Sequence, residues 1–81
     1  METYANLSGN SSVVRYLVGS GSIVVEFASG SDTFYKYTHI SAGQSAIEEM
    51  VRLAKQGQGL NSYIRTNKPP YASKGTTLNS L

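Results

Sequence analysis

The sequence predicts a small α+β fold, in which a three-stranded antiparallel β-meander packs on one main α-helix and a short second helix follows. Apolar and polar residues alternate over residues 13–18, 23–27 and 33–37, which is typical of β-strands. After Ile40 the apolar period changes from two residues to 3.6, which is typical of a helix packed on a sheet. Neither an internal repeat nor a linker divides the chain, so we expect a single domain over residues 12–73.

Composition narrows the classes of protein to consider. The chain has 81 residues, a formal net charge of +2 and no cysteine, which excludes disulfides and thiolate metal ligands. Its apolar runs are far shorter than a membrane span and its N-terminus lacks the pattern of a signal peptide. We therefore expect a cytoplasmic protein with no membrane partner. The net charge is compatible with nucleic-acid binding, but it is smaller than that of proteins with a strongly basic nucleic-acid-binding surface.

Both ends of the chain are polar. Residues 1–11 are rich in Asn, Ser and Gly, and we expect them to be disordered. Residues 74–81 predict a flexible, weakly basic tail. Tyr71 is expected to anchor the last ordered turn.

The strand over residues 33–37 organises the predicted sheet. Tyr35 and Tyr37 share one face of it, and we place Phe27 opposite Tyr35 and Val25 opposite Tyr37. That register needs a loop with an odd number of residues, such as residues 30–32. A register shift of one residue would turn every core side chain outward.

Residues 19–22 contain two glycines and predict a hairpin loop. A four-residue loop places Arg15 opposite Glu26, with Lys36 next along, as an exposed ladder of alternating charge. It also extends the core face across a third strand through the pairs Val18 with Ile23, Tyr16 with Val25, and Val14 with Phe27.

The main helix has two possible starts. Ser41 with Gln44 and Ser45 with Glu48 each match a capping box, and the sequence does not distinguish them. Gly57 is a natural left-handed stop. The apolar stripe of this helix comprises Ile47, Met50, Val51 and Ala54.

A short second helix is indicated by Leu60, Tyr63 and Ile64. It ends before Pro69 and Pro70, because proline cannot continue a helix.

The chain contains, in order, Glu26-Phe27, Tyr35-Lys36-Tyr37, Gly57, residues 60–65 and Pro70-Tyr71. Together these pieces resemble the KTSC domain, a short domain at the C-terminus of some lysyl-tRNA synthetases that also occurs alone in small bacterial and phage proteins. The resemblance covers residues 12–73, and its central Tyr-x-Tyr motif is matched by Tyr35 and Tyr37. Residues 38–46 depart from it by their length and lack of proline. The resemblance implies a structural role for the motif residues and, through the synthetase context, RNA binding.

Basic and aromatic residues interleave towards the C-terminus, as they do in single-strand binders, where cations contact phosphates and rings contact bases. The alternative is a solvated edge with Tyr63 and Tyr71 packed as anchors. Tyr35 and Tyr37 could also stack on bases, although the alternation favours a core role for them. Weak RNA or DNA binding is our leading functional hypothesis. Its candidate residues are Lys36, Arg65, Lys68, Tyr71 and Lys74.

The second face of the predicted sheet is also apolar, so the alternative function is a protein-interaction module, either a homodimer or one that docks on a larger protein. Partial shielding by the N-terminal segment and by the stems of Arg15 and Lys36 is the competing explanation. The candidate interface residues are Val13, Leu17, Val24 and Phe34.

Catalysis is not expected. His39 is the only histidine and Asp32 lies in a turn, where aspartate is common for backbone reasons. Glu48 and Glu49 are adjacent on a helix and diverge by about 100°, so they do not form an acid and base pair. No set of residues predicts a metal site or a cofactor.

Overall fold

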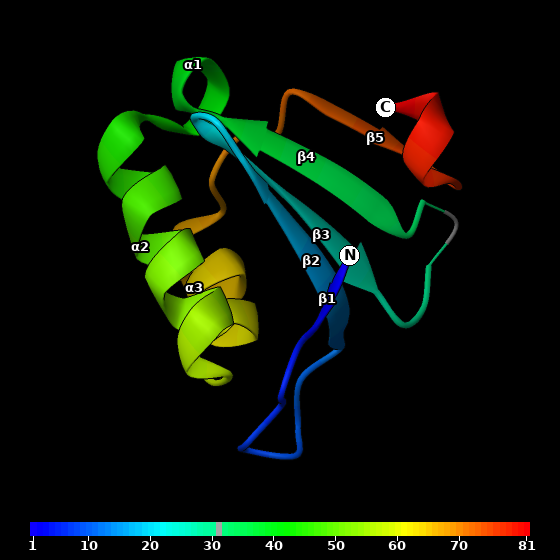
Figure 1. The fold of residues 1–81 in the computed structure, drawn as a ribbon, viewed down its shortest axis with the longest axis vertical. Helices are drawn as coiled ribbons and strands as arrows, with labels where there is room; N and C mark the ends of the chain where they lie inside the picture. The colour runs from blue at the N-terminus through cyan, green and yellow to red at the C-terminus, as the bar shows by residue number, and fades with distance from the viewer. Residues whose placement is uncertain (31) are drawn as a thin grey trace.

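The computed structural model describes residues 1–30 and 32–81, and over these residues the chain forms a five-stranded antiparallel sheet with three α-helices (Figure 1). The small α+β fold is confirmed, and the sheet has a further strand at each edge of the predicted meander. The strands are β1 (Glu2–Thr3), β2 (Val13–Gly19), β3 (Ser22–Phe27), β4 (Phe34–Thr38) and β5 (Ser73–Gly75), and the helices are α1 (His39–Ala42), α2 (Gln44–Gln56), α3 (Leu60–Asn67) and a 3-10 turn, η1 (Leu78–Ser80).

The sheet order follows the chain order, so each strand pairs with its neighbours in sequence. Figure 1 shows α2 and α3 packed together on one side of the sheet, with β5 and η1 at the opposite edge. No helix in the described part of the chain is long and apolar enough to cross a membrane.

The N-terminal segment differs from the predicted disorder. Glu2 pairs with Tyr16 and Thr3 with Arg15, and the Tyr4 amide donates to the Val14 carbonyl at 2.9 Å. The Tyr4 side chain is only 4% exposed and belongs to the core. Burial of one large aromatic ring outweighs the polar composition around it.

The C-terminal segment also differs from the predicted flexible tail. Lys74 pairs with Tyr35 and Gly75 with Phe34, so β5 adds an edge strand beside β4. The polar sequence did not reveal this strand because its ladder bonds come from backbone groups, which every residue has.

A β-bulge between Val13 and Arg15 alters one predicted pair. Val18 with Ile23, Tyr16 with Val25 and Arg15 with Glu26 pair as predicted, but Val13, and not Val14, lies opposite Phe27. A bulge inserts an extra residue and reverses the alternation beyond it. Val13 is therefore 2% exposed in the main core, whereas Val14 is 40% exposed. Both the core position of Val14 and the interface position of Val13 were predicted wrongly.

Between β3 and β4 the register is shifted by two residues from the prediction. Val25 lies opposite Tyr35 and Ile23 opposite Tyr37. The face of every side chain is unchanged, because a shift of two preserves the alternation. Lys36 lies opposite Val24, so the predicted ladder is limited to the ion pair of Arg15 and Glu26.

Neither predicted capping box starts the main helix. Thr38 and Ser41 cap α1 reciprocally, with the Ser41 amide donating to Thr38 Oγ1 at 3.1 Å and the Thr38 amide to Ser41 Oγ at 3.0 Å. Gly43, at φ 94°, separates α1 from α2, which begins at Gln44. The Gly57 stop is confirmed in the left-handed conformation, and α3 forms where the second helix was predicted.

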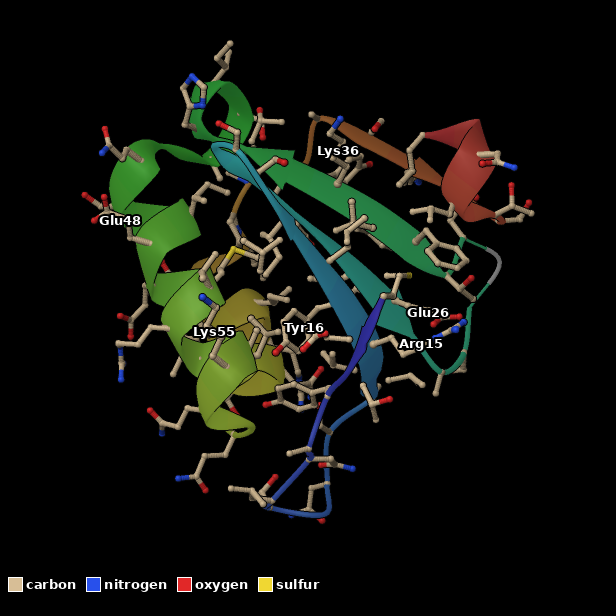
Figure 2. All side chains as sticks on the ribbon, viewed as in Figure 1. Arg15, Tyr16, Glu26, Lys36, Glu48 and Lys55 are labelled. Atoms are coloured by element: carbon tan, nitrogen blue, oxygen red, sulfur yellow. The ribbon has the colours of Figure 1, made fainter. Side chains whose placement is uncertain are left out.

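The core lies between the sheet and the two longer helices. Figure 2 shows Tyr16 directed from β2 towards the helices, whereas Arg15 and Glu26 lie together on the other side of the sheet. Helix α2 contributes the stripe predicted for it apart from Val51, which is only half-buried. The largest fully buried side chains are Ile23, Val25, Met50 and Leu60.

Candidate functional site

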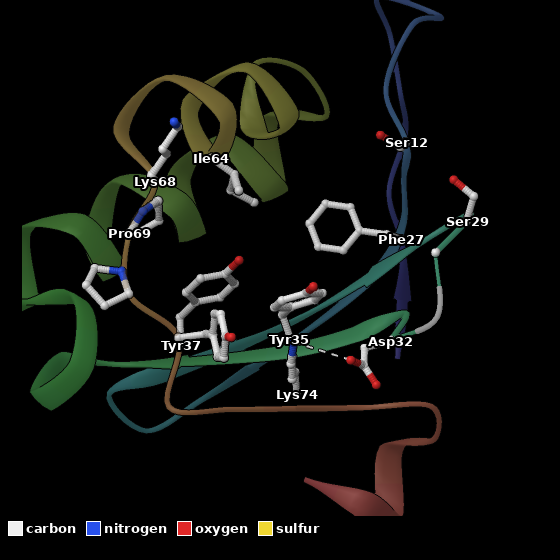
Figure 3. A pocket seen from close by; sticks show the side chains of 13 residues that line it. Ser12, Phe27, Ser29, Asp32, Tyr35, Tyr37, Ile64, Lys68, Pro69 and Lys74 are labelled. Carbon is white, nitrogen blue, oxygen red and sulfur yellow. Dashed lines mark ion pairs between the residues drawn. The ribbon is translucent and has the colours of Figure 1, made fainter.

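A groove of about 610 Å³ opens between the loop after β3, strand β4 and the segment that follows α3 (Figure 3). We call it the tyrosine groove. Its aromatic lining is Phe27, Tyr35, Tyr37 and Tyr71, and its charged residues are Asp32, Lys68 and Lys74.

Tyr35 is the centre of the aromatic lining. Its ring meets Phe27 edge-on at 5.5 Å between centroids and Tyr71 edge-on at 5.1 Å, and it is nearly parallel to Tyr37 at 6.4 Å. Edge-to-face contacts at these distances are favourable for aromatic pairs. Tyr71 keeps 45% of its surface exposed, so this ring remains accessible to a planar ligand.

Tyr71 reaches Tyr35 because the chain turns sharply after α3. Lys68 caps the helix at φ 47°, and Pro69 and Pro70 prevent another helical turn. The Ala72 amide then donates to the Lys36 carbonyl at 2.7 Å, which aligns the following β5 with β4.

The charges of the tyrosine groove are not evenly spread. Lys74 Nζ lies 3.4 Å from Asp32 Oδ2 and 5.6 Å from the centroid of the Tyr71 ring. The hydrogen bond with Asp32, followed by the nearby Tyr71, raises the pKa of Lys74, which stays a cation. In Figure 3, Lys68 lies at the far end of the groove from this ion pair.

Tyr37 lies at the boundary between the groove and the core. It belongs to the core cluster, and burial, together with the nearby Tyr35 and Tyr71, raises its pKa to about 12. Phe27 and Tyr35 are half-buried and pack against the same cluster. Phe27, Tyr35 and Tyr37 therefore both pack against the core and line the groove. The alternation pattern predicted only the packing.

The structure brings together three of the five residues predicted to bind nucleic acid, namely Lys68, Tyr71 and Lys74. Lys36 lies on the opposite face of β4 from Tyr35, and Arg65 is exposed on α3 without lining the groove. Asp32 was not predicted as a groove residue, because its place in the sequence indicated only a turn.

The predicted interface face is largely closed by the chain itself. Val24 and Phe34 are buried, at 6% and 8% exposure, and Val13 lies in the core on the helix side. The fourth predicted interface residue, Leu17, is 40% exposed and stays accessible. The alternation of apolar and polar residues correctly predicted an apolar second face of the sheet. It could not show that this face is covered by contacts within the chain.

The residues weighed for catalysis are dispersed. His39 Nδ1 and the Gly21 carbonyl are 3.3 Å apart beside the β2–β3 turn, and Glu48 accepts a hydrogen bond from Gln44 at 3.0 Å. Among the residues that the structure describes, no three His, Cys, Asp or Glu side chains converge as a metal site would need.

No protein-family model, curated protein or solved structure matches this chain.

Proposed function

We propose that this protein is a small non-enzymatic binding module of the KTSC type, which acts in the cytoplasm and binds single-stranded RNA weakly through the tyrosine groove. One observation carries the proposal. An exposed Tyr71 is held edge-on to Tyr35 with Lys74 Nζ 5.6 Å from its ring centroid, and Lys68 lines the same groove at its far end from Lys74.

The chemistry of single-stranded nucleic acid suits this arrangement. Every base offers a π-face, and stacking on an aromatic side chain contributes about 1–3 kcal/mol per base. Lysine contacts with phosphates add an attraction that weakens as salt rises. A groove of about 610 Å³ has room for an unstacked base beside Tyr71. With two lysines and one aspartate in the groove, the electrostatic contribution is small and the binding is expected to be weak.

Fluorescence anisotropy of a labelled ten-nucleotide RNA of mixed sequence tests the proposal, at low and at moderate salt. Two phosphate contacts predict a slope of about −1.4 for the logarithm of the association constant against the logarithm of salt concentration. Lys68→Gln should reduce the size of that slope by about 0.7. The matched control is Lys55→Gln, since Lys55 is also an exposed lysine but lies on α2 outside the groove.

Tyr71→Ala tests the stacking contact separately from charge. Loss of one base–aromatic stack should weaken binding by about 5- to 150-fold at constant salt. Lys36→Gln, on the other face of β4, should have no such effect. The proposal is abandoned if wild-type protein at millimolar concentration leaves the anisotropy of the RNA unchanged at low salt.

A further inference from the structure

The tyrosine groove contains a carboxylate, which a site for phosphates alone does not need. Asp32 lies in the loop between β3 and β4, and its side chain keeps 31% of its surface exposed. Near a phosphate this charge would be repulsive. A role in recognition of a different part of the nucleotide would account for its position.

The ion pair with Lys74 gives this end of the groove a defined hydrogen-bonding pattern. Asp32 is an acceptor through two oxygens and Lys74 is a donor only. Lys74 Nζ contacts Oδ2 at 3.4 Å, so an acceptor and a donor lie side by side. The lysine is also held against the Tyr71 ring, at 5.6 Å from its centroid, which places both groups near the edge of a base stacked there.

We propose that the pair of Asp32 and Lys74 recognises the Watson–Crick edge of a guanine base stacked on Tyr71, an inference that rests on the nucleic-acid binding proposed above. Guanine presents two adjacent donors, N1–H and N2–H, next to the acceptor O6. The two carboxylate oxygens accept from the two donors, and the ammonium donates to O6. Lys68, at the other end of the groove, is then the one groove lysine that contacts phosphate. RNA whose guanine is bound should therefore show a salt slope of about −0.7, whereas RNA that contacts both lysines through its phosphates should show about −1.4.

The other bases match this pattern less well. Adenine and cytosine each offer an amino donor beside a ring-nitrogen acceptor, which leaves one carboxylate oxygen without a donor. Uracil offers one N–H between two carbonyl oxygens, so one of these oxygens faces the carboxylate. A bidentate contact typically discriminates between bases by about 5- to 150-fold. The site should therefore prefer guanine.

Four labelled uridine octamers, with guanosine, adenosine, cytidine or uridine at the fourth position, measure this preference by anisotropy. We expect the guanosine octamer to bind about 5- to 150-fold more tightly than the all-uridine octamer. An octamer with inosine at that position, which lacks the N2 amino group, should lose part of the gain without any change to the protein.

Asp32→Asn should bring the ratio of the affinities for the guanosine and all-uridine octamers, both measured on the same variant, down to about 1. Glu48→Gln removes the same charge from an exposed position on α2, outside the tyrosine groove, and should leave the preference intact. Amide NMR spectra of both variants show whether they are folded.

The outcomes separate the two proposals. Equal binding of all four octamers overturns guanine recognition and leaves the nucleic-acid function in place. No binding of any octamer at low salt overturns both. GMP as an unlabelled competitor distinguishes the two sources of the base: competition as strong as that of the unlabelled guanosine octamer supports guanine recognition but assigns the groove to a free nucleotide.

Discussion

The Tyr4 hydroxyl accepts a hydrogen bond from the backbone amide of Leu60, at 3.3 Å. Helix α3 begins after Gly59, which has no side chain to cap it, so one of its first amides is satisfied by a residue from the other end of the chain. Both side chains are buried. The N-terminal segment is thereby joined to the helix whose C-terminal end leads into the tyrosine groove.

Tyr4→Phe should lower the free energy of unfolding by about 1–3 kcal/mol, because the Leu60 amide would remain buried without a partner. Urea denaturation followed by circular dichroism measures the change. Tyr63→Phe is the matched control, since Tyr63 is half-buried against the same core, and it should change stability by less than about 0.5 kcal/mol. Equal effects of the two substitutions would count against the capping role.

Because of the bulge in β2, Val13 should contribute more to stability than Val14, which is the reverse of what simple alternation predicts. Val13→Ala removes two buried methyl groups and should cost about 1–3 kcal/mol. Val14→Ala, at an exposed position, should cost less than about 0.5 kcal/mol. Thermal or urea unfolding of the two variants decides the register, because a strand without the bulge would reverse their order.

Stability should fall at alkaline pH because of Tyr37. Burial raises its folded pKa to about 12, against 10.0 for the unperturbed group. The unfolded chain therefore loses this proton first as pH rises. The stabilising contribution is complete below pH 10 and is lost between pH 10 and about 12, with a size on the order of 2 kcal/mol.

Urea titrations at several pH values between 9 and 12 test this for the wild type and for Tyr37→Phe, in which the group is absent. The difference in unfolding free energy between the two proteins should shrink or change sign across this range. A constant difference would mean that Tyr37 ionises alike in the folded and unfolded chain.

Two substitutions separate the buried and exposed parts of the second sheet face. Phe34→Glu should destabilise the fold by about 3 kcal/mol or more, since Phe34 is 8% exposed and a carboxylate there would lack a partner. Leu17→Glu, at 40% exposure, should leave stability within about 0.5 kcal/mol. Denaturation measures both effects, and sedimentation velocity of the wild type and Leu17→Glu reports any homodimer that uses the exposed part. A stable, folded Phe34→Glu protein would contradict the burial of this face.

The periodic segments of this protein were predictable from sequence. Alternation identified the three central strands, the 3.6-residue stripe identified α2, and Gly57 marked its end. These signals are local, because each depends on which side of a strand or helix a residue lies. The hairpin at residues 19–22 also set most of the β2–β3 register, since a tight turn leaves few alternatives.

The candidate site was only partly predictable. Lys68, Tyr71 and Lys74 were identified from their interleaved pattern, but Asp32 and the central position of Tyr35 were not. Asp32 and Lys74 are far apart in sequence and meet because β5 pairs with β4. No local pattern encodes such a contact.

Sequence by itself therefore determined the class of fold, the central meander, the main helix and the aromatic character of β4, because hydrophobic periodicity reports the environment of each residue along one element. Tertiary structure alone decided that both polar termini add strands, that a bulge turns Val13 inward, and that Tyr71 and Lys74 close on Tyr35 and Asp32 as a groove. Those outcomes depend on backbone hydrogen bonds and packing between distant segments, whose free energy is gained only when the whole chain is assembled.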